Sequence, residues 1–355
     1  MSPISDNLAM SDNLAVELAV PRADDLAPTV ANVRASCAAA ASAPDSPVKV
    51  DVEAARALGA ELGQIPSSAP GHLMGIDPAF SGNNAKANFI VALHLFNFGH
   101  AYRHPLHQYA GQGAWQTMLA GIQRMHQAAA PDGINAAFLA DVTSADVCQW
   151  LMVPADQVLL TPLIDMTVAV AHATARDLRA ANVENFAEFM EASRSRDATT
   201  SACATVEALA RGFAAFNDRR QLANGSYALL LKKAQIAVGE LWLHLAADEP
   251  ERYDYHDLES LTVVCDNVLP CVLRARGILK LDATLGARID GRTPLPAGMA
   301  EASLRAAAVY ASEIMLEAAP IGINSKQLSD WLWTSGKDPQ FRPLERHATP
   351  DTCFY

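Results

Sequence analysis

The stretch YALLLKKAQIAVGELWLHLAAD, residues 227 to 248, decides the fold class. Its apolar residues recur at the spacing of one face of an α-helix: Ala234, Val238, Leu241, Trp242 and Leu245. This spacing predicts an amphipathic helix with one buried face. Lys232 and Lys233 are expected to begin its polar side.

Similar helical patterns occupy residues 162–181, 185–193, 204–216 and 300–319, whereas alternating strand-like runs are rare. The segment VKVDV, residues 48–52, is at most a short strand. Helix breaks are predicted at Pro131-Asp132-Gly133, at Asn224-Gly225, at residues 248–257 and at Thr293-Pro294-Leu295-Pro296. None reads as a long linker, so we predict an all-α chain with a single globular domain.

The N-terminal residues have a different composition. SDNLA occurs at residues 5–9 and again at 11–15, and Pro21 and Pro28 follow in a polar, alanine-rich context. We predict a poorly ordered extension over residues 1–28 and a folded domain over 29–355.

The net charge, the N-terminal residues and the cysteine spacing disfavour several classes of protein. A net charge of −12 disfavours direct nucleic-acid binding, because that affinity comes mainly from lysine and arginine. The first 40 residues lack a basic leader followed by an apolar run, so a cytoplasmic protein without a membrane span is expected. Six cysteines without a C-x-x-C pair are expected to be reduced, buried thiols: Cys37, Cys148, Cys203, Cys265, Cys271 and Cys353.

The run LTVVCDNVLPCVL, residues 261–273, contains one ionisable residue, Asp266. Pro270 is tolerated in a first helical turn, so Asp266 would lie at or just before a helix N-terminus and could act as its cap. A carboxylate among apolar residues is costly, however, and such costs are often found at functional sites. Asp266 is therefore a candidate for either role.

Histidines cluster in and before FNFGHAYRHPLH, residues 96–107: His94, His100, His104 and His107. A metal site is disfavoured, because no H-E-x-x-H is present, Pro105 interrupts the helical register, and no nearby carboxylate or cysteine completes a ligand set. We predict surface or pocket-lining histidines and no metal.

The segment 328–355 interleaves aromatic and charged residues: Asp330, Trp331, Trp333, Phe341, Arg342, Arg346 and His347. Such a set can hold a flat heterocycle by stacking and hydrogen bonding, or it can dock the segment on the domain. Glycine-rich nucleotide loops and the G-x-S-x-G of serine hydrolases are absent, which disfavours nucleotide-cofactor, kinase and serine-hydrolase functions.

An ordered series of motifs resembles the queuosine salvage family, the queuosine 5′-phosphate N-glycosylase/hydrolases. The series is NFGHAY (97–102), GAWQTM (113–118), PLID (162–165), LKKAQI (231–236), CDNVLP (265–270), SLRAAAVY (303–310), LW (332–333) and HATPDTCFY (347–355). The resemblance implies an all-α fold similar to DNA glycosylases and a reaction without metal or cofactor. It also implies cleavage of the N-glycosidic bond of queuosine 5′-monophosphate, which releases queuine for tRNA modification.

The resemblance assigns roles to particular residues. Asp266 would be the catalytic carboxylate, and Lys232 would pair with it or with the 5′-phosphate. The remaining assignments are to substrate binding: Asn97, Phe98 and His100 near the substrate, and Asp330 and Trp333 at the base.

Four positions depart from the family pattern. Val264 replaces a frequent aromatic, Ser329 and Thr334 stand where carboxylates are common around the LW pair, and His94 replaces a carboxylate. We therefore expect Val264 to line the substrate site and base recognition to be altered, with Val264→Phe shifting preference toward queuosine 5′-monophosphate.

Two functions remain open. The first is an N-glycosidase acting on queuosine 5′-monophosphate or a related 7-deazaguanine nucleotide or nucleoside, and the second is a non-catalytic binding protein on the same scaffold. The expected partner in both is a small molecule. A DNA glycosylase is disfavoured by the acidic charge.

Overall fold

The computed structural model describes residue 18 and residues 26–63, 80–194, 200–222 and 225–355. The described chain is mainly helical, which confirms the predicted all-α class. Its α-helices are α2 (Val30–Ser42), α3 (Val52–Glu61), α4 (Asn83–Leu95), α5 (Arg103–Ala110), α6 (Ala114–Ala128), α7 (Ala136–Ala140), α8 (Ser144–Leu151), α9 (Thr161–Ala180), α10 (Phe186–Ser193), α11 (Ala202–Gly212), α12 (Lys232–Leu245), α13 (Pro250–Tyr253), α14 (Val268–Ala275), α15 (Ala283–Asp290), α16 (Met299–Ala318) and α17 (Ser325–Ser335).

Short strands form two antiparallel pairs. β1 (Val48–Val50) pairs with β4 (Leu279–Leu281), so residues 48–52 do contain a short strand. β2 (Arg219–Gln221) pairs with β3 (Tyr227–Leu229). The first described helix begins at Val30, where the Thr29 side chain accepts a hydrogen bond from the N–H of Asn32. Most of the predicted extension, residues 1–17 and 19–25, lies outside the described residues.

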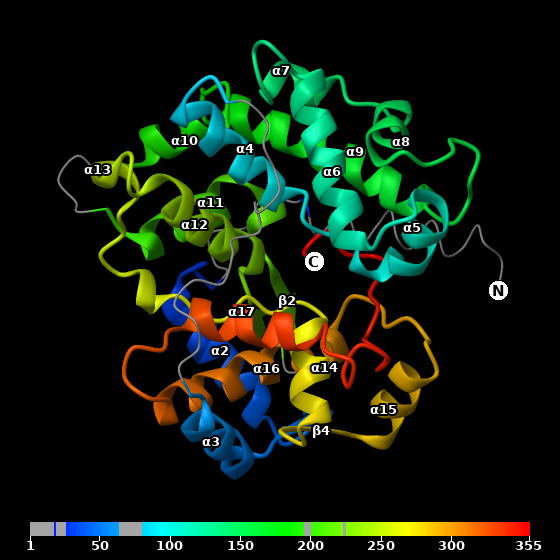
Figure 1. The fold of residues 1–355 in the computed structure, drawn as a ribbon, viewed down its shortest axis with the longest axis vertical. Helices are drawn as coiled ribbons and strands as arrows, with labels where there is room; N and C mark the ends of the chain where they lie inside the picture. Colours follow the sequence, from blue (N-terminus) through cyan, green and yellow to red (C-terminus); the bar gives the residue numbers. More distant parts are fainter. Residues whose placement is uncertain (1–17, 19–25, 64–79, 195–199, 223–224) are drawn as a thin grey trace.

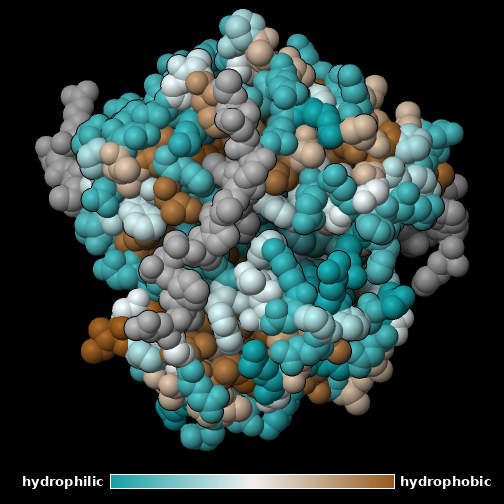
Figure 2. All heavy atoms as spheres, viewed as in Figure 1, coloured by the Kyte–Doolittle hydropathy of each residue, from teal (hydrophilic) through white to brown (hydrophobic). Residues whose placement is uncertain are grey.

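The helices lie in two groups (Figure 1). The upper group contains α4 to α13, and the lower group contains α2, α3 and α14 to α17. One hydrophobic cluster includes buried side chains from both groups, such as Phe89 on α4 and Met315 on α16. Figure 2 shows this face hollowed right of its centre, between the two groups, with hydrophilic side chains along the hollow.

Helix α16 is the centre of the lower group. It packs against α2, α3 and α14, and buried residues occur all around it. Gly59 on α3 allows the close approach of the two helices, because a side chain there would overlap the carbonyl group of Met315. Because α16 is surrounded by other elements, small alanine side chains on most of its faces let the neighbouring helices pack closely.

Helix α12 differs from its sequence prediction at its start. Tyr227–Leu229 forms β3 instead of helix, and Leu231 has a left-handed backbone (φ +48°) just before α12 begins. The prediction that Lys232 and Lys233 lie on a polar side is wrong, since both are buried. Asn224-Gly225 was read as a helix break, but the strands on either side of it make a hairpin; Asn224 itself lies outside the described residues.

All six cysteines are free thiols, and five are buried, whereas Cys203 is half-buried. In the described segments we find no helix with both the length and the apolar character needed to cross a bilayer.

Candidate active site

One pocket gathers seven of the eight side chains that the sequence assigned to the site. It lies among α6, α12, α17 and two connecting segments, and its lining residues are Asn97, His100, Trp115, Lys232, Ile236, Val264, Asp266, Ser329, Asp330 and Trp333. Its volume is about 20 Å³, which is room for about one water molecule. A larger ligand therefore requires the lining side chains to move.

The eighth residue, Phe98, does not line the pocket. Its side chain is buried, and the ammonium group of Lys233 lies 5.2 Å from the centre of its ring. Lys233 also donates hydrogen bonds to the carbonyl groups of Leu95 and Cys353, both at 2.7 Å. Phe98 and Lys233 thus hold together the segments behind the pocket.

Local structure places the polar side chains. Asn97 and His100 follow the end of α4, where Gly99 takes a left-handed backbone (φ +98°). Lys232 is the first residue of α12. Asp330 and Trp333 are three residues apart on α17, so they lie on the same helix face.

Asp266 has a different neighbour for each carboxylate oxygen. Oδ1 accepts a hydrogen bond of 2.7 Å from the N–H of Val268, the first residue of α14. Oδ2 lies 3.9 Å from Nε2 of His100. Asn267 is the N-cap residue of α14, so Asp266 lies one position before it and still accepts a helix-terminal N–H, whereas its functional role stays a prediction.

A fully buried ion cluster supports the backbone beside Asp266. The Arg305 guanidinium donates to Asp218 at 2.6 Å and to Glu301 at 3.0 Å, and its Nε donates to the carbonyl oxygen of Cys265 at 3.1 Å. None of the three charged side chains is exposed. Arg305 thereby fixes the residue that precedes Asp266.

The pocket favours an ionised Asp266. Burial is the largest influence on its pKa and acts to raise it, but protonated His100, the Lys232 ammonium and the N–H of Val268 outweigh burial and lower the pKa below the ordinary value. Burial lowers the pKa of Lys232 to about 8, although Asp266 acts in the opposite direction. Burial, followed by the charge of Lys232, lowers the pKa of His100 to about 4, so its imidazole is neutral at pH 7.

The four histidines singled out from the sequence do not converge. His94 is fully buried, His100 lines the pocket, and His104 and His107 are exposed on α5. Pro105 does not break a helix, because it lies in the first turn of α5. Within the described ranges, no group of three or more histidine, cysteine or acidic side chains has an arrangement that could hold a metal ion.

The aromatic residues near the end of the chain divide between two roles. Trp333 lines the pocket, and the Lys337 ammonium lies 3.6 Å from the centre of its ring. Trp331 and Phe341 instead pack against the guanidinium of Arg276, at 5.1 and 5.2 Å. Docking thus describes part of this segment, and ligand contact by Trp333 stays a prediction.

Sequence reasoning did not single out three lining residues as contacts: Trp115, Ile236 and Ser329. Trp115 and Ile236 belong to the GAWQTM and LKKAQI blocks, so the family resemblance was the signal that could have found them. Ser329 was noted only as a departure, yet its hydroxyl accepts a 3.0 Å hydrogen bond from the N–H of Val264.

Comparison with known proteins places the chain in a family. A family model described as queuosine salvage protein matches residues 77–355. The chain belongs to this queuosine salvage family. It is also similar to the "Queuosine 5′-phosphate N-glycosylase/hydrolase" of Sphaerobacter thermophilus, with 28% identity over 283 residues. That alignment covers 77% of this chain and 83% of the relative, and Asn97, Lys232, Asp266 and Asp330 all lie within the range of the family match.

Proposed function

We propose that this protein is a hydrolase that cleaves the base–sugar bond of queuosine 5′-monophosphate or a related 7-deazaguanine nucleotide or nucleoside. The observation that carries the proposal is a buried, ionised carboxylate, Asp266, in a pocket of a queuosine salvage protein. The name of the Sphaerobacter relative, queuosine 5′-phosphate N-glycosylase/hydrolase, supports the reaction and the substrate class.

The chemistry of the bond explains why a carboxylate is needed. As the base leaves with the bonding electrons, positive charge develops on the sugar, and a fixed carboxylate in a pocket with little water stabilises that charge. A 7-deazaguanine has no N7 to protonate, so more of the catalysis must come from the sugar side. We assign this role to Asp266.

Water completes the reaction by adding its oxygen to the sugar carbon, and the proton that it loses balances the proton gained by the base, which left with the electron pair of the broken bond. His100 is neutral, and its Nε2 is 3.9 Å from Oδ2 of Asp266. Both groups can contact one water molecule between them. We propose that Asp266 and His100 orient this water, while the ammonium of Lys232 pairs with Asp266 or with the 5′-phosphate.

The base is proposed to lie near Trp115 and Trp333, which contribute aromatic side chains to the same pocket from α6 and α17. Aromatic side chains hold flat heterocycles by stacking, with about 1–3 kcal/mol per base in nucleic-acid complexes. Asn97 supplies a polar group for the edge of the ring, and Asp330 supplies one for the base and its substituent. Val264 lines the same pocket. Phe98 does not line it and instead packs with Lys233 behind it.

The test is to incubate purified protein with queuosine, queuosine 5′-monophosphate, guanosine and adenosine, and to detect free base by mass spectrometry. Release of queuine from the deazaguanine substrates is expected. Binding of these compounds without release of base would instead favour a non-catalytic protein on the same scaffold. Activity is expected to survive exhaustive chelation, and inactivation that zinc reverses would contradict the proposed mechanism.

A further inference from the structure

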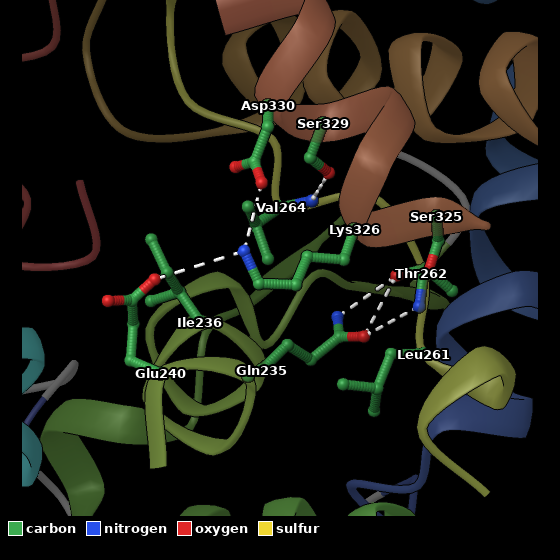
Figure 3. Close-up of a pocket in the computed structure, with 11 residues that line it drawn as sticks. Gln235, Ile236, Glu240, Leu261, Thr262, Val264, Ser325, Lys326, Ser329 and Asp330 are labelled. Atoms are coloured by element: carbon green, nitrogen blue, oxygen red, sulfur yellow. Dashed lines mark hydrogen bonds and ion pairs between the residues drawn. The ribbon is translucent and has the colours of Figure 1, made fainter. Parts of the chain in front are cut away.

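A second pocket adjoins the Asp266 pocket. Four side chains line both pockets: Ile236, Val264, Ser329 and Asp330. The second pocket is also lined by Glu240 on α12 and Lys326 on α17 (Figure 3). The shared side chains make the two pockets neighbouring parts of one cleft between α12 and α17.

Charged side chains meet inside the second pocket. The Lys326 ammonium lies 2.9 Å from Oδ2 of Asp330 and 3.9 Å from Oε1 of Glu240 (Figure 3). The Glu240 side chain is only 1% exposed, and its other oxygen lies 3.3 Å from Nε2 of His244. Two carboxylates therefore share the Lys326 ammonium in this part of the cleft.

The cation between these carboxylates is replaceable. A buried carboxylate such as Glu240 is costly without a positive partner. Lys326 supplies one such partner from the end of a flexible side chain that is 21% exposed, so its ammonium can move into solvent. Another ammonium group that enters the cleft can then take its place with the same charge.

We propose that Glu240 and Asp330 form a subsite for a protonated amine on the 7-substituent of the deazaguanine base, and that Lys326 occupies this subsite until substrate displaces it. This inference rests on the proposed function, because it places the base in the adjoining pocket. Queuosine belongs to the substrate class it defines, since the arm on its base contains a secondary amine. Lys326 is then a specificity-determining residue that lowers affinity for the amine.

The test compares kcat/KM for two matched nucleotides, the 5′-monophosphates of 7-aminomethyl-7-deazaguanosine and 7-cyano-7-deazaguanosine. Only the first contains an amine. Lys326→Met removes the competing ammonium and is expected to raise the amine-to-cyano ratio about tenfold, whereas Glu240→Gln is expected to lower it about tenfold. Lys280→Met is the matched control, because Lys280 pairs with Asp51 at an exposed site on β4; the ratio should not change.

A second measurement does not need turnover. In isothermal titration calorimetry, Glu240→Gln should weaken binding of the free base 7-aminomethyl-7-deazaguanine about tenfold relative to the 7-cyano base. Unchanged ratios and unchanged relative affinities in both variants would overturn the subsite. Failure of the native protein to release queuine from queuosine 5′-monophosphate would overturn the proposed function, while the calorimetry would still decide the subsite.

Discussion

Asp266 and His100 approach each other from different parts of the fold, with Oδ2 of the carboxylate 3.9 Å from Nε2 of the imidazole. His100 belongs to the segment after α4, and Asp266 precedes α14. The other oxygen of Asp266 caps α14 through the N–H of Val268. Asp266 therefore contacts the start of α14 with one oxygen and faces His100 in the pocket with the other. Mutation can separate the structural contact from the proposed catalytic role.

Asp266→Asn should lower kcat about 10²–10³-fold, because the amide has no charge to stabilise the developing cation. The amide oxygen can still accept the N–H of Val268, so the melting temperature should change little. Asp282→Asn is the matched control, since Asp282 caps α15 through the N–H of Leu285 outside the pocket. Near-normal turnover of Asp266→Asn would leave this residue with capping alone.

The pH dependence of activity should reveal Lys232. Its pKa is lowered to about 8, so its ammonium is present below pH 8 and is lost as the pH rises through that value. If the positive charge is needed, kcat/KM of the free enzyme falls above about pH 8. The substrate phosphate, with a second pKa near 6, does not produce this change.

Lys232→Arg provides the check, because arginine stays charged up to about pH 12. Whatever activity this variant retains should persist to higher pH than in the native protein. Lys280→Arg, at the exposed pair with Asp51, should keep the native profile. A decline near pH 8 that is the same in Lys232→Arg would assign it to another group.

Arg305 should contribute strongly to stability. Arg305→Met leaves Asp218 and Glu301 buried without their cation, which is expected to lower the free energy of unfolding by about 3–5 kcal/mol. Arg274→Met removes a more exposed pair with Asp290 and should cost at most about 1 kcal/mol. Urea unfolding of the three proteins measures both values, and equal midpoints for the two variants would contradict this ranking.

Helical periodicity was sufficient to predict the long helices. Residues 162–181 and 300–319 match α9 (Thr161–Ala180) and α16 (Met299–Ala318) closely. The start of α12 could not be located in this way, because the apolar run before Lys232 fits a buried strand as well as a helix. Asn224-Gly225 was the informative signal there, since this dipeptide favours a hairpin turn.

Lys232 and Lys233 show a second limit. A lysine in a helical pattern normally indicates an exposed face, but Lys233 is buried because it reaches the carbonyl groups of Leu95 and Cys353. Those acceptors are 138 and 120 residues away in the sequence. Local patterns contain no information about partners at such separations.

The ordered motifs predicted eight site residues, and seven of them line one pocket. Glu240 was not anticipated, because within its helix it reads as an ordinary polar position. The structure shows that the Glu240 carboxylate is buried and that the Lys326 ammonium approaches it from α17. The family resemblance was therefore enough to predict residues of the Asp266 pocket. The residues of the adjoining second pocket could be found only from the folded structure.

Val264→Phe tests how the two pockets are used. From the sequence alone, phenylalanine was expected to restore a stacking surface and shift preference toward queuosine 5′-monophosphate. Val264 lies where the pockets meet, however, and lines both. A larger ring there should obstruct the passage from the Asp266 pocket to Glu240, because overpacking a filled site typically costs about 1–3 kcal/mol.

We therefore expect Val264→Phe to lower kcat/KM for queuosine 5′-monophosphate about tenfold or more, and to affect 7-deazaguanosine 5′-monophosphate less, because that nucleotide has no arm to pass Val264. Val264→Ala widens the same passage and should not reduce the preference for the longer substrate. Kinetics of the three proteins on both nucleotides make the comparison. A gain for queuosine 5′-monophosphate in Val264→Phe would show that stacking at this position outweighs obstruction, and it would place the arm elsewhere in the cleft.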